Sequence, residues 1–203
     1  MCIDLKTSLI SLGIGELSGL LLTTKTEDKK VIGLFIMFYS LVQFFEANMY
    51  YYGSNASDIY SRLLLLNLGF QGIVFFYLLS SVIKIDSIYF IICGLISLYI
   101  LLESIKPDFK AASISNCIKW NFITDEVTSC LFLMYLTMFY WMYFDPKVPA
   151  NLSISKESTD FINLFGIFFT ITFGVSYFLN RYSNTPGIWC LMSTLTAPIL
   201  LLF

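Results

Sequence analysis

The chain has 203 residues and a net charge of −2, with 57% hydrophobic and only 13% charged residues. Soluble domains carry about 25% charged residues, so this composition indicates an integral membrane protein. Without a basic patch, it excludes nucleic acid as a partner. Histidine is absent, which excludes His-ligated zinc or haem and the nucleophile systems that depend on imidazole. We therefore expect no metal and no cofactor.

The apolar runs predict a single transmembrane domain over residues 1–203. A helix needs about 20 mostly apolar residues to cross the hydrocarbon. The runs that meet this need cover residues 7–23, 31–52, 61–82, 87–105, 125–144, 159–179 and 187–203. The predicted fold class is all-α, a polytopic membrane helix bundle of seven transmembrane helices with the lipid bilayer as partner. Six spans are the alternative, if the last run is re-entrant.

The first run carries small residues on one face. Ser11, Gly15 and Gly19 recur at four-residue spacing, a pattern that lets two helix backbones approach closely. Glu16 lies beside this face. Its carboxyl has two interpretations, a hydrogen bond at a helix contact and a functional role.

The second run is the centre of the predicted site. Ser40, Gln43, Glu46 and Tyr50 fall close to one stripe of a helix. A carboxylate at membrane depth costs roughly 2.5–3.5 kcal/mol on insertion scales. The stripe should therefore face other helices or a wet cavity, and Glu46 is a functional candidate.

The third run adds Asn67 and Gln71, one turn apart. Interhelical hydrogen bonding is the favoured interpretation of this pair. Further along, the connection at residues 106–125 contains Lys119 and Trp120. That combination is typical of a segment that rests at the lipid headgroups.

Three short runs resemble an uncharacterised family of small seven-helix membrane proteins from giant DNA viruses and some bacteria. They are FYSLVQFFEA at residues 38–47, NLGFQ at 67–71 and GIWC at 187–190. The family has a Glu and a Gln one turn apart on its second helix, and Gln43 and Glu46 occupy these places in swapped order. Asn67 stands where the family has His, and Gly72 where it has Pro. The resemblance implies seven helices, points to Gln43, Glu46, Asn67, Gln71, Trp189 and Cys190, and implies no activity.

These observations lead to a functional hypothesis with two alternatives. An acid-bearing polar interior indicates a transporter- or channel-like protein that handles a cation, a proton or a small polar molecule through Gln43 and Glu46. The first alternative is a non-catalytic membrane-organising or assembly protein whose polar groups only lock helices together. The second is an intramembrane lipid-modifying enzyme, which the absence of histidine disfavours. Lysine and arginine are balanced across the predicted membrane, six on each side, so the positive-inside rule gives no orientation.

Overall fold

The structure is a computed structural model that describes residues 4–114, 118–144, 164–167, 171 and 198–202. Its helices are α1 (Leu5–Thr23), α2 (Glu27–Tyr52), the short 3₁₀ helix η1 (Gly53–Asn55), α3 (Ser57–Leu79), α4 (Ser87–Ser104) and α5 (Asp125–Phe144). Two short strands, β1 (Ser113–Ile114) and β2 (Ile118–Lys119), pair antiparallel before α5. The all-α prediction is confirmed. Most of the residues predicted for the sixth and seventh spans lie outside the described residues.

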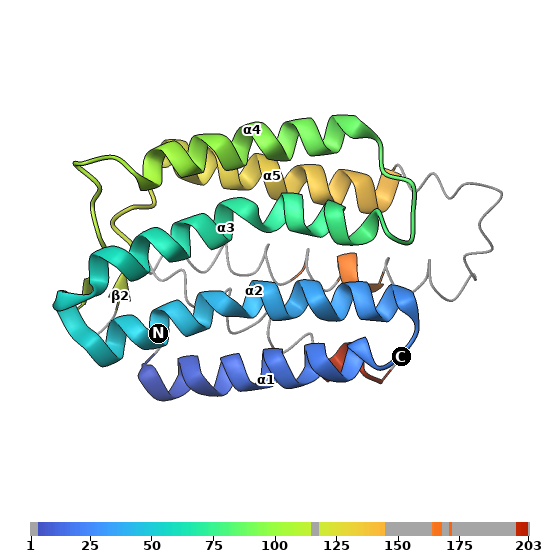
Figure 1. The fold of residues 1–203 in the computed structure, drawn as a ribbon, viewed down its shortest axis with the longest axis horizontal. Helices are drawn as coiled ribbons and strands as arrows, with labels where there is room; N and C mark the ends of the chain where they lie inside the picture. Colours follow the sequence, from blue (N-terminus) through green and yellow to red (C-terminus); the bar gives the residue numbers. More distant parts are fainter. Residues whose placement is uncertain (1–3, 115–117, 145–163, 168–170, 172–197, 203) are drawn as a thin grey trace.

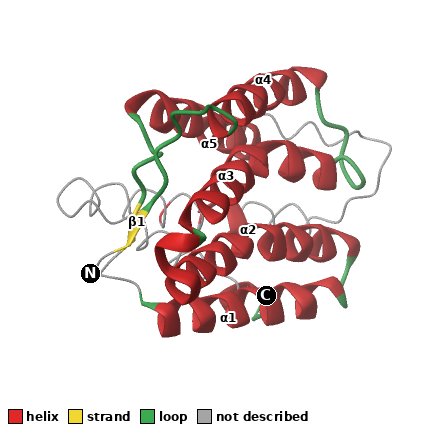
Figure 2. Ribbon diagram, turned by 60° about the vertical axis from the view of Figure 1, so that its left-hand side comes forward, coloured by secondary structure: helices red, strands yellow, loops and turns green. Residues whose placement is uncertain are grey.

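Four helices, α1 to α4, are long and apolar enough to cross a membrane. They lie side by side in chain order, and α5 packs against α3 and α4 (Figure 1). Each link between α1 and α4 is short, so consecutive helices run antiparallel. Figure 2 shows the same order from another side, with β1 beyond one end of the bundle. We refer to this as the hairpin end.

Two helices begin four residues earlier than the apolar runs predict. Helix α2 starts at Glu27 instead of residue 31, because Glu27 and Asp28 lie at the positive end of the helix dipole, where acids are favourable. Helix α3 starts at Ser57 instead of residue 61 and ends at Leu79 instead of 82. The predicted loop at 53–60 therefore shrinks to η1. Gly53 begins this turn with a φ of 66°, which glycine adopts without strain.

The outer surface of the bundle carries many large apolar side chains. Inside, Phe35, Phe75, Phe76 and Trp141 are buried, and the ring of Trp141 lies 6.2 Å from Phe75 and 5.9 Å from Phe76. Outside, Leu17 on α1 and Leu95 on α4 are among many large aliphatic residues that are more than half exposed. Exposed apolar surface on this scale suits lipid contact.

Helices α1 and α2 cross closely at two glycines. A Cβ atom on Gly33 would lie 2.5 Å from the carbonyl oxygen of Gly19, and a Cβ on Gly19 would lie 2.8 Å from the carbonyl oxygen of Gly33. Ser11, Gly15 and Gly19, the predicted contact face, are all buried, and Gly19 lies in the close crossing. This crossing fixes the register between the two helices.

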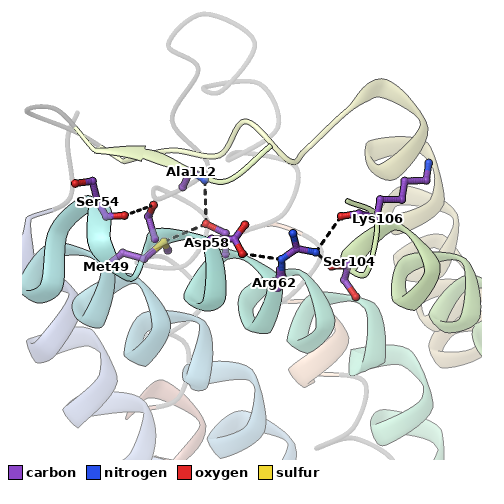
Figure 3. A network of polar contacts seen from close by, with 9 residues as sticks. Met49, Ser54, Asp58, Arg62, Ser104, Lys106 and Ala112 are labelled. Atoms are coloured by element: carbon purple, nitrogen blue, oxygen red, sulfur yellow. Dashed lines mark hydrogen bonds and ion pairs between the residues drawn. The ribbon is translucent and has the colours of Figure 1, made fainter. Parts of the chain in front are cut away.

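A network of polar contacts ties α3 to the hairpin end of the bundle (Figure 3). Arg62 pairs with Asp58 at 2.9 Å and donates to the carbonyl oxygens of Ser104, the last residue of α4, and of Lys106, just after it. Its guanidinium also lies 4.4 Å from the centre of the Phe109 ring. The connection after α4 is thus attached to α3 before it forms the hairpin.

Candidate functional site

Gln43 and Glu46 are buried on α2, as the polar stripe predicts. Gln43 is 1% exposed and Glu46 is 3% exposed. Glu46 lies six residues before the last residue of α2, so at 1.5 Å per residue it sits about 9 Å inside the hairpin end of the helix. The two side chains are neither at the surface nor at mid-bundle.

Three of the four side-chain polar atoms of this pair lack hydrogen-bond partners within the described residues. Among the described residues, Glu46 Oε2 and both Oε1 and Nε2 of Gln43 have none. The indole of Trp120 and the amide of Gln43 lie beside the Glu46 carboxyl without satisfying these atoms. A buried polar atom left unpaired costs about 1–3 kcal/mol, and such groups are rare in native proteins. An unsatisfied acid and amide side by side indicate a site that a ligand or proton completes.

The hairpin brings Trp120 to this pair. Trp120 is 9% exposed and stacks on Phe122, which stacks on Phe109, with ring centres 5.8 Å apart in both contacts. The Ile118 N–H donates to the Tyr50 hydroxyl at 3.3 Å, which holds β2 over the end of α2. Trp120, which the sequence placed in a segment resting at the lipid headgroups, packs in this aromatic stack with its indole beside the Glu46 carboxyl. The depth of the segment in a membrane stays a prediction.

Glu16 does not join the Gln43–Glu46 pair. The Ser40 hydroxyl donates to Glu16 Oε1 at 2.6 Å, across the α1–α2 contact. Of the two interpretations open for Glu16, the structure shows the hydrogen bond at a helix contact. This carboxyl is partnered and lies about 9 Å along α2 from Glu46.

Asn67 and Gln71 form a separate, satisfied chain of hydrogen bonds. The Tyr135 hydroxyl on α5 donates to Gln71 Oε1 at 2.6 Å, Gln71 donates to Asn67 Oδ1 at 3.3 Å, and Asn67 donates to the Phe38 carbonyl at 3.0 Å. The chain crosses α5, α3 and α2, and the interhelical interpretation of the pair agrees with these bonds. No hydrogen bond among the described residues joins it to Gln43 or Glu46.

Sequence reasoning missed Tyr135 and Trp120. The only signal for Tyr135 is a hydroxyl in the middle of an apolar run, and α5 contains several tyrosines. The two remaining predicted residues, Trp189 and Cys190, lie outside the described residues. Among the residues that the structure describes, no three His, Cys, Asp or Glu side chains lie close enough together to hold a metal ion.

In the part of the chain that the structure describes, fold and site thus define a helical bundle with four apolar helices of membrane length and a buried acid–amide pair with unpaired polar atoms. Comparison with protein-family models, curated proteins and solved structures found no match.

Proposed function

We propose that this chain is a seven-span integral membrane protein that binds a proton or a small cation at Glu46 and Gln43, in a transporter- or channel-like role. The main support is the buried Glu46–Gln43 pair, in which Glu46 Oε2 and both polar atoms of Gln43 have no hydrogen-bond partner among the described residues. A carboxyl in that setting is stabilised either by a bound proton or by a bound cation. The remainder of the fold supplies no large extramembrane unit for other work within the described residues.

The proposed count of seven spans is supported by the helices and by the apolar runs. Helices α1 to α4 provide four, and α5 packs antiparallel to α4 with Phe132, Leu133 and Leu136 about half exposed on its outer side. The runs at 159–179 and 187–203 supply the last two. The resemblance to the giant-virus family stays a prediction that agrees with this count.

A second candidate is a membrane-organising protein, and a different observation favours it. The Tyr135–Gln71–Asn67 chain is satisfied at every link, and the Gly19–Gly33 crossing is tightly packed. Both are devices that lock helices together. The hydrogen-bond chain accounts for Asn67 and Gln71, and the bond from Ser40 accounts for Glu16, whereas Gln43 and Glu46 have no such account.

One experiment separates the two candidates. The thermal stability of the purified protein is measured in detergent from pH 5 to 8, with and without monovalent and divalent cations, for the wild type, Glu46→Gln and Glu16→Gln. Glu16→Gln is the matched control, because its carboxyl is also in a span but is already bonded to Ser40.

We expect pH or a cation to shift the wild type and Glu16→Gln, and to leave Glu46→Gln unchanged. A ligand at 100 times its dissociation constant adds about 2.7 kcal/mol, which for a protein of this size raises the midpoint by roughly 5–10 °C. A cation effect should grow from pH 5 to 8, because the ligating carboxylate must be ionised. If all three proteins respond alike, Glu46 is a structural group and the organising role is the better account.

A further inference from the structure

Two serines of α1 share the unusual state of Gln43 and Glu46. Ser8 is fully buried and Ser11 is 1% exposed, and neither hydroxyl has a hydrogen-bond partner among the described residues. Serine in a helix usually donates to a carbonyl of the preceding turn. Elsewhere in this bundle buried serines do so, as Ser104 does to Leu101 at 2.7 Å and Ser97 to Cys93 at 2.8 Å. The free hydroxyls of Ser8 and Ser11 are therefore exceptions that need a physical reason.

The register of α1 on α2 places these serines at the level of the acid–amide pair. Gly19 meets Gly33, and Glu16 bonds Ser40. In an antiparallel pair, each residue toward the start of α1 is matched by one toward the end of α2. Continuing the register from these two contacts places Ser11 opposite residues 41–45, which include Gln43. It places Ser8 opposite residues 44–48, which include Glu46.

The four side chains also lie on the inner side of the helix pair. On the outer side, Leu9 of α1 is 51% exposed and Phe44 of α2 is 43% exposed. Ser8, Ser11, Gln43 and Glu46 are each at least 97% buried. Level and burial together place one carboxyl, one amide and two hydroxyls at the same height of the bundle, on the buried sides of α1 and α2.

The chemistry of this set fits a hard monovalent cation. Carboxylate, amide carbonyl and hydroxyl oxygens are hard ligands, and the single carboxylate balances a single positive charge. Calcium takes six to eight oxygen ligands and gains affinity from several carboxylates, while magnesium keeps much of its water. Neither requirement is met by one acid in a buried contact.

We propose that α1 and α2 form an alkali-cation site of the sodium class, with oxygen ligands from Ser8, Ser11, Gln43 and Glu46. This inference rests on the proposed function of the Glu46–Gln43 pair and names the ion class and two more ligands. Trp120 and the hairpin cover the pair at its outer end. The ion neutralises Glu46 and satisfies the hydroxyls that the protein leaves unpaired.

The test is the thermal midpoint of the full-length protein in detergent at pH 7.5, titrated with NaCl, LiCl or KCl against choline chloride at constant ionic strength. The variants are Ser8→Ala, Ser11→Ala and the double variant, with Ser18→Ala as matched control. Ser18 is also a buried serine of α1, two turns from Ser11 and away from the level of the site.

We expect the thermal midpoint of the wild type to be higher in sodium chloride than in choline chloride. The sodium concentration that gives half of this increase should be about tenfold or more higher in the double variant and unchanged in Ser18→Ala. In choline the alanine variants should be as stable as the wild type, since they delete hydroxyls that bond nothing. Sodium protection that is equal in all four serine variants overturns the ligand assignment but leaves Glu46 as an ion site. A response to pH without any response to alkali cations overturns the cation site and retains a proton site. A Glu46→Gln protein that still responds to sodium like the wild type rejects the proposed function itself.

Discussion

Some buried polar side chains in this bundle have complete hydrogen bonds and others have unpaired atoms. This difference separates residues with a structural role from candidates for ligand binding. Tyr135, Gln71 and Asn67 bond one another and end on a backbone carbonyl. Gln43 and Glu46 lie on the same helix as that carbonyl yet have unpaired atoms. A chain of complete hydrogen bonds specifies how the helices pack. Buried polar groups without partners raise the free energy of the empty protein, and a ligand that binds them lowers it again.

We predict that Tyr135→Phe destabilises the fold without altering any cation response. The change leaves Gln71 Oε1 without its donor in a buried setting. Interhelical hydrogen bonds in membrane proteins average about 0.6 kcal/mol, and an orphaned acceptor costs about 1–3 kcal/mol, so a loss of roughly 1 kcal/mol is expected. The measurement is the free energy of unfolding in a denaturing-detergent titration.

The control for this change is Tyr77→Phe, because Tyr77 is 70% exposed and a surface change should stay within about 0.5 kcal/mol. In a Gln71→Leu background, Tyr135→Phe should cost much less, since its partner is gone. Equal losses in both backgrounds would show that the hydroxyl does not act through Gln71.

For single residues, the sequence predicts which polar side chains are buried better than it predicts their hydrogen-bond partners. The stripe of Ser40, Gln43 and Glu46 could be predicted because a lipid-facing carboxylate is too costly. The bond from Ser40 to Glu16 could not be predicted, since it depends on the rotation of α1 about its axis. Ser11 was predicted only as a small residue at a helix contact, because nothing in a sequence reports whether a hydroxyl bonds its own backbone.

At the scale of elements, helix length was predicted closely and the connections were not. Apolar runs fix where a span must be, but capping acids such as Glu27 lengthen α2 into a segment that hydropathy assigns to a loop. The hairpin of β1 and β2 is two residues long on each side, too short for any alternation to appear. Its inward turn depends on the stacking of Trp120 on Phe122, a tertiary contact.

The crossing of α1 and α2 gives a prediction about helix packing. Gly33→Ala should destabilise the protein by about 1–3 kcal/mol, the usual cost of overpacking, because the new Cβ would meet the backbone oxygen of Gly19, which cannot move aside alone. Gly13→Ala is the matched control, since nothing lies within 4 Å of a Cβ there, and alanine is the better helix former. Detergent unfolding measures both.

The two variants Gly33→Ala and Gly13→Ala also test the cation site. If the crossing sets the register of α1 on α2, Gly33→Ala should reduce both the stability of the protein and its stabilisation by sodium. Gly13→Ala should reduce neither. A Gly33→Ala protein as stable as the wild type would mean that α1 and α2 do not approach as closely as the structure shows.

At the scale of the whole molecule, the two ends of the bundle are built differently. The hairpin end carries the Arg62 network and the ordered connection after α4 (Figure 3). The opposite end, among the described residues, has only the short links after α1 and α3. The proposed site lies about 9 Å inside the hairpin end, so an ion would reach it from one side of a membrane more easily than from the other.

This asymmetry is testable through membrane topology. In a variant with all five native cysteines replaced, single cysteines are introduced by Lys6→Cys and Lys110→Cys at the hairpin end and by Lys25→Cys and Lys84→Cys at the opposite end; all four positions are exposed. Because antiparallel spans alternate sides, a membrane-impermeant maleimide applied to sealed vesicles should label one pair and not the other, until detergent opens access to both. The equal basic charge on the two sides leaves open which pair is outside, so the experiment also fixes the orientation. Labelling of all four positions in intact vesicles would mean that these helices do not span the membrane. That result would reject both the seven-span arrangement and a one-sided route to Glu46.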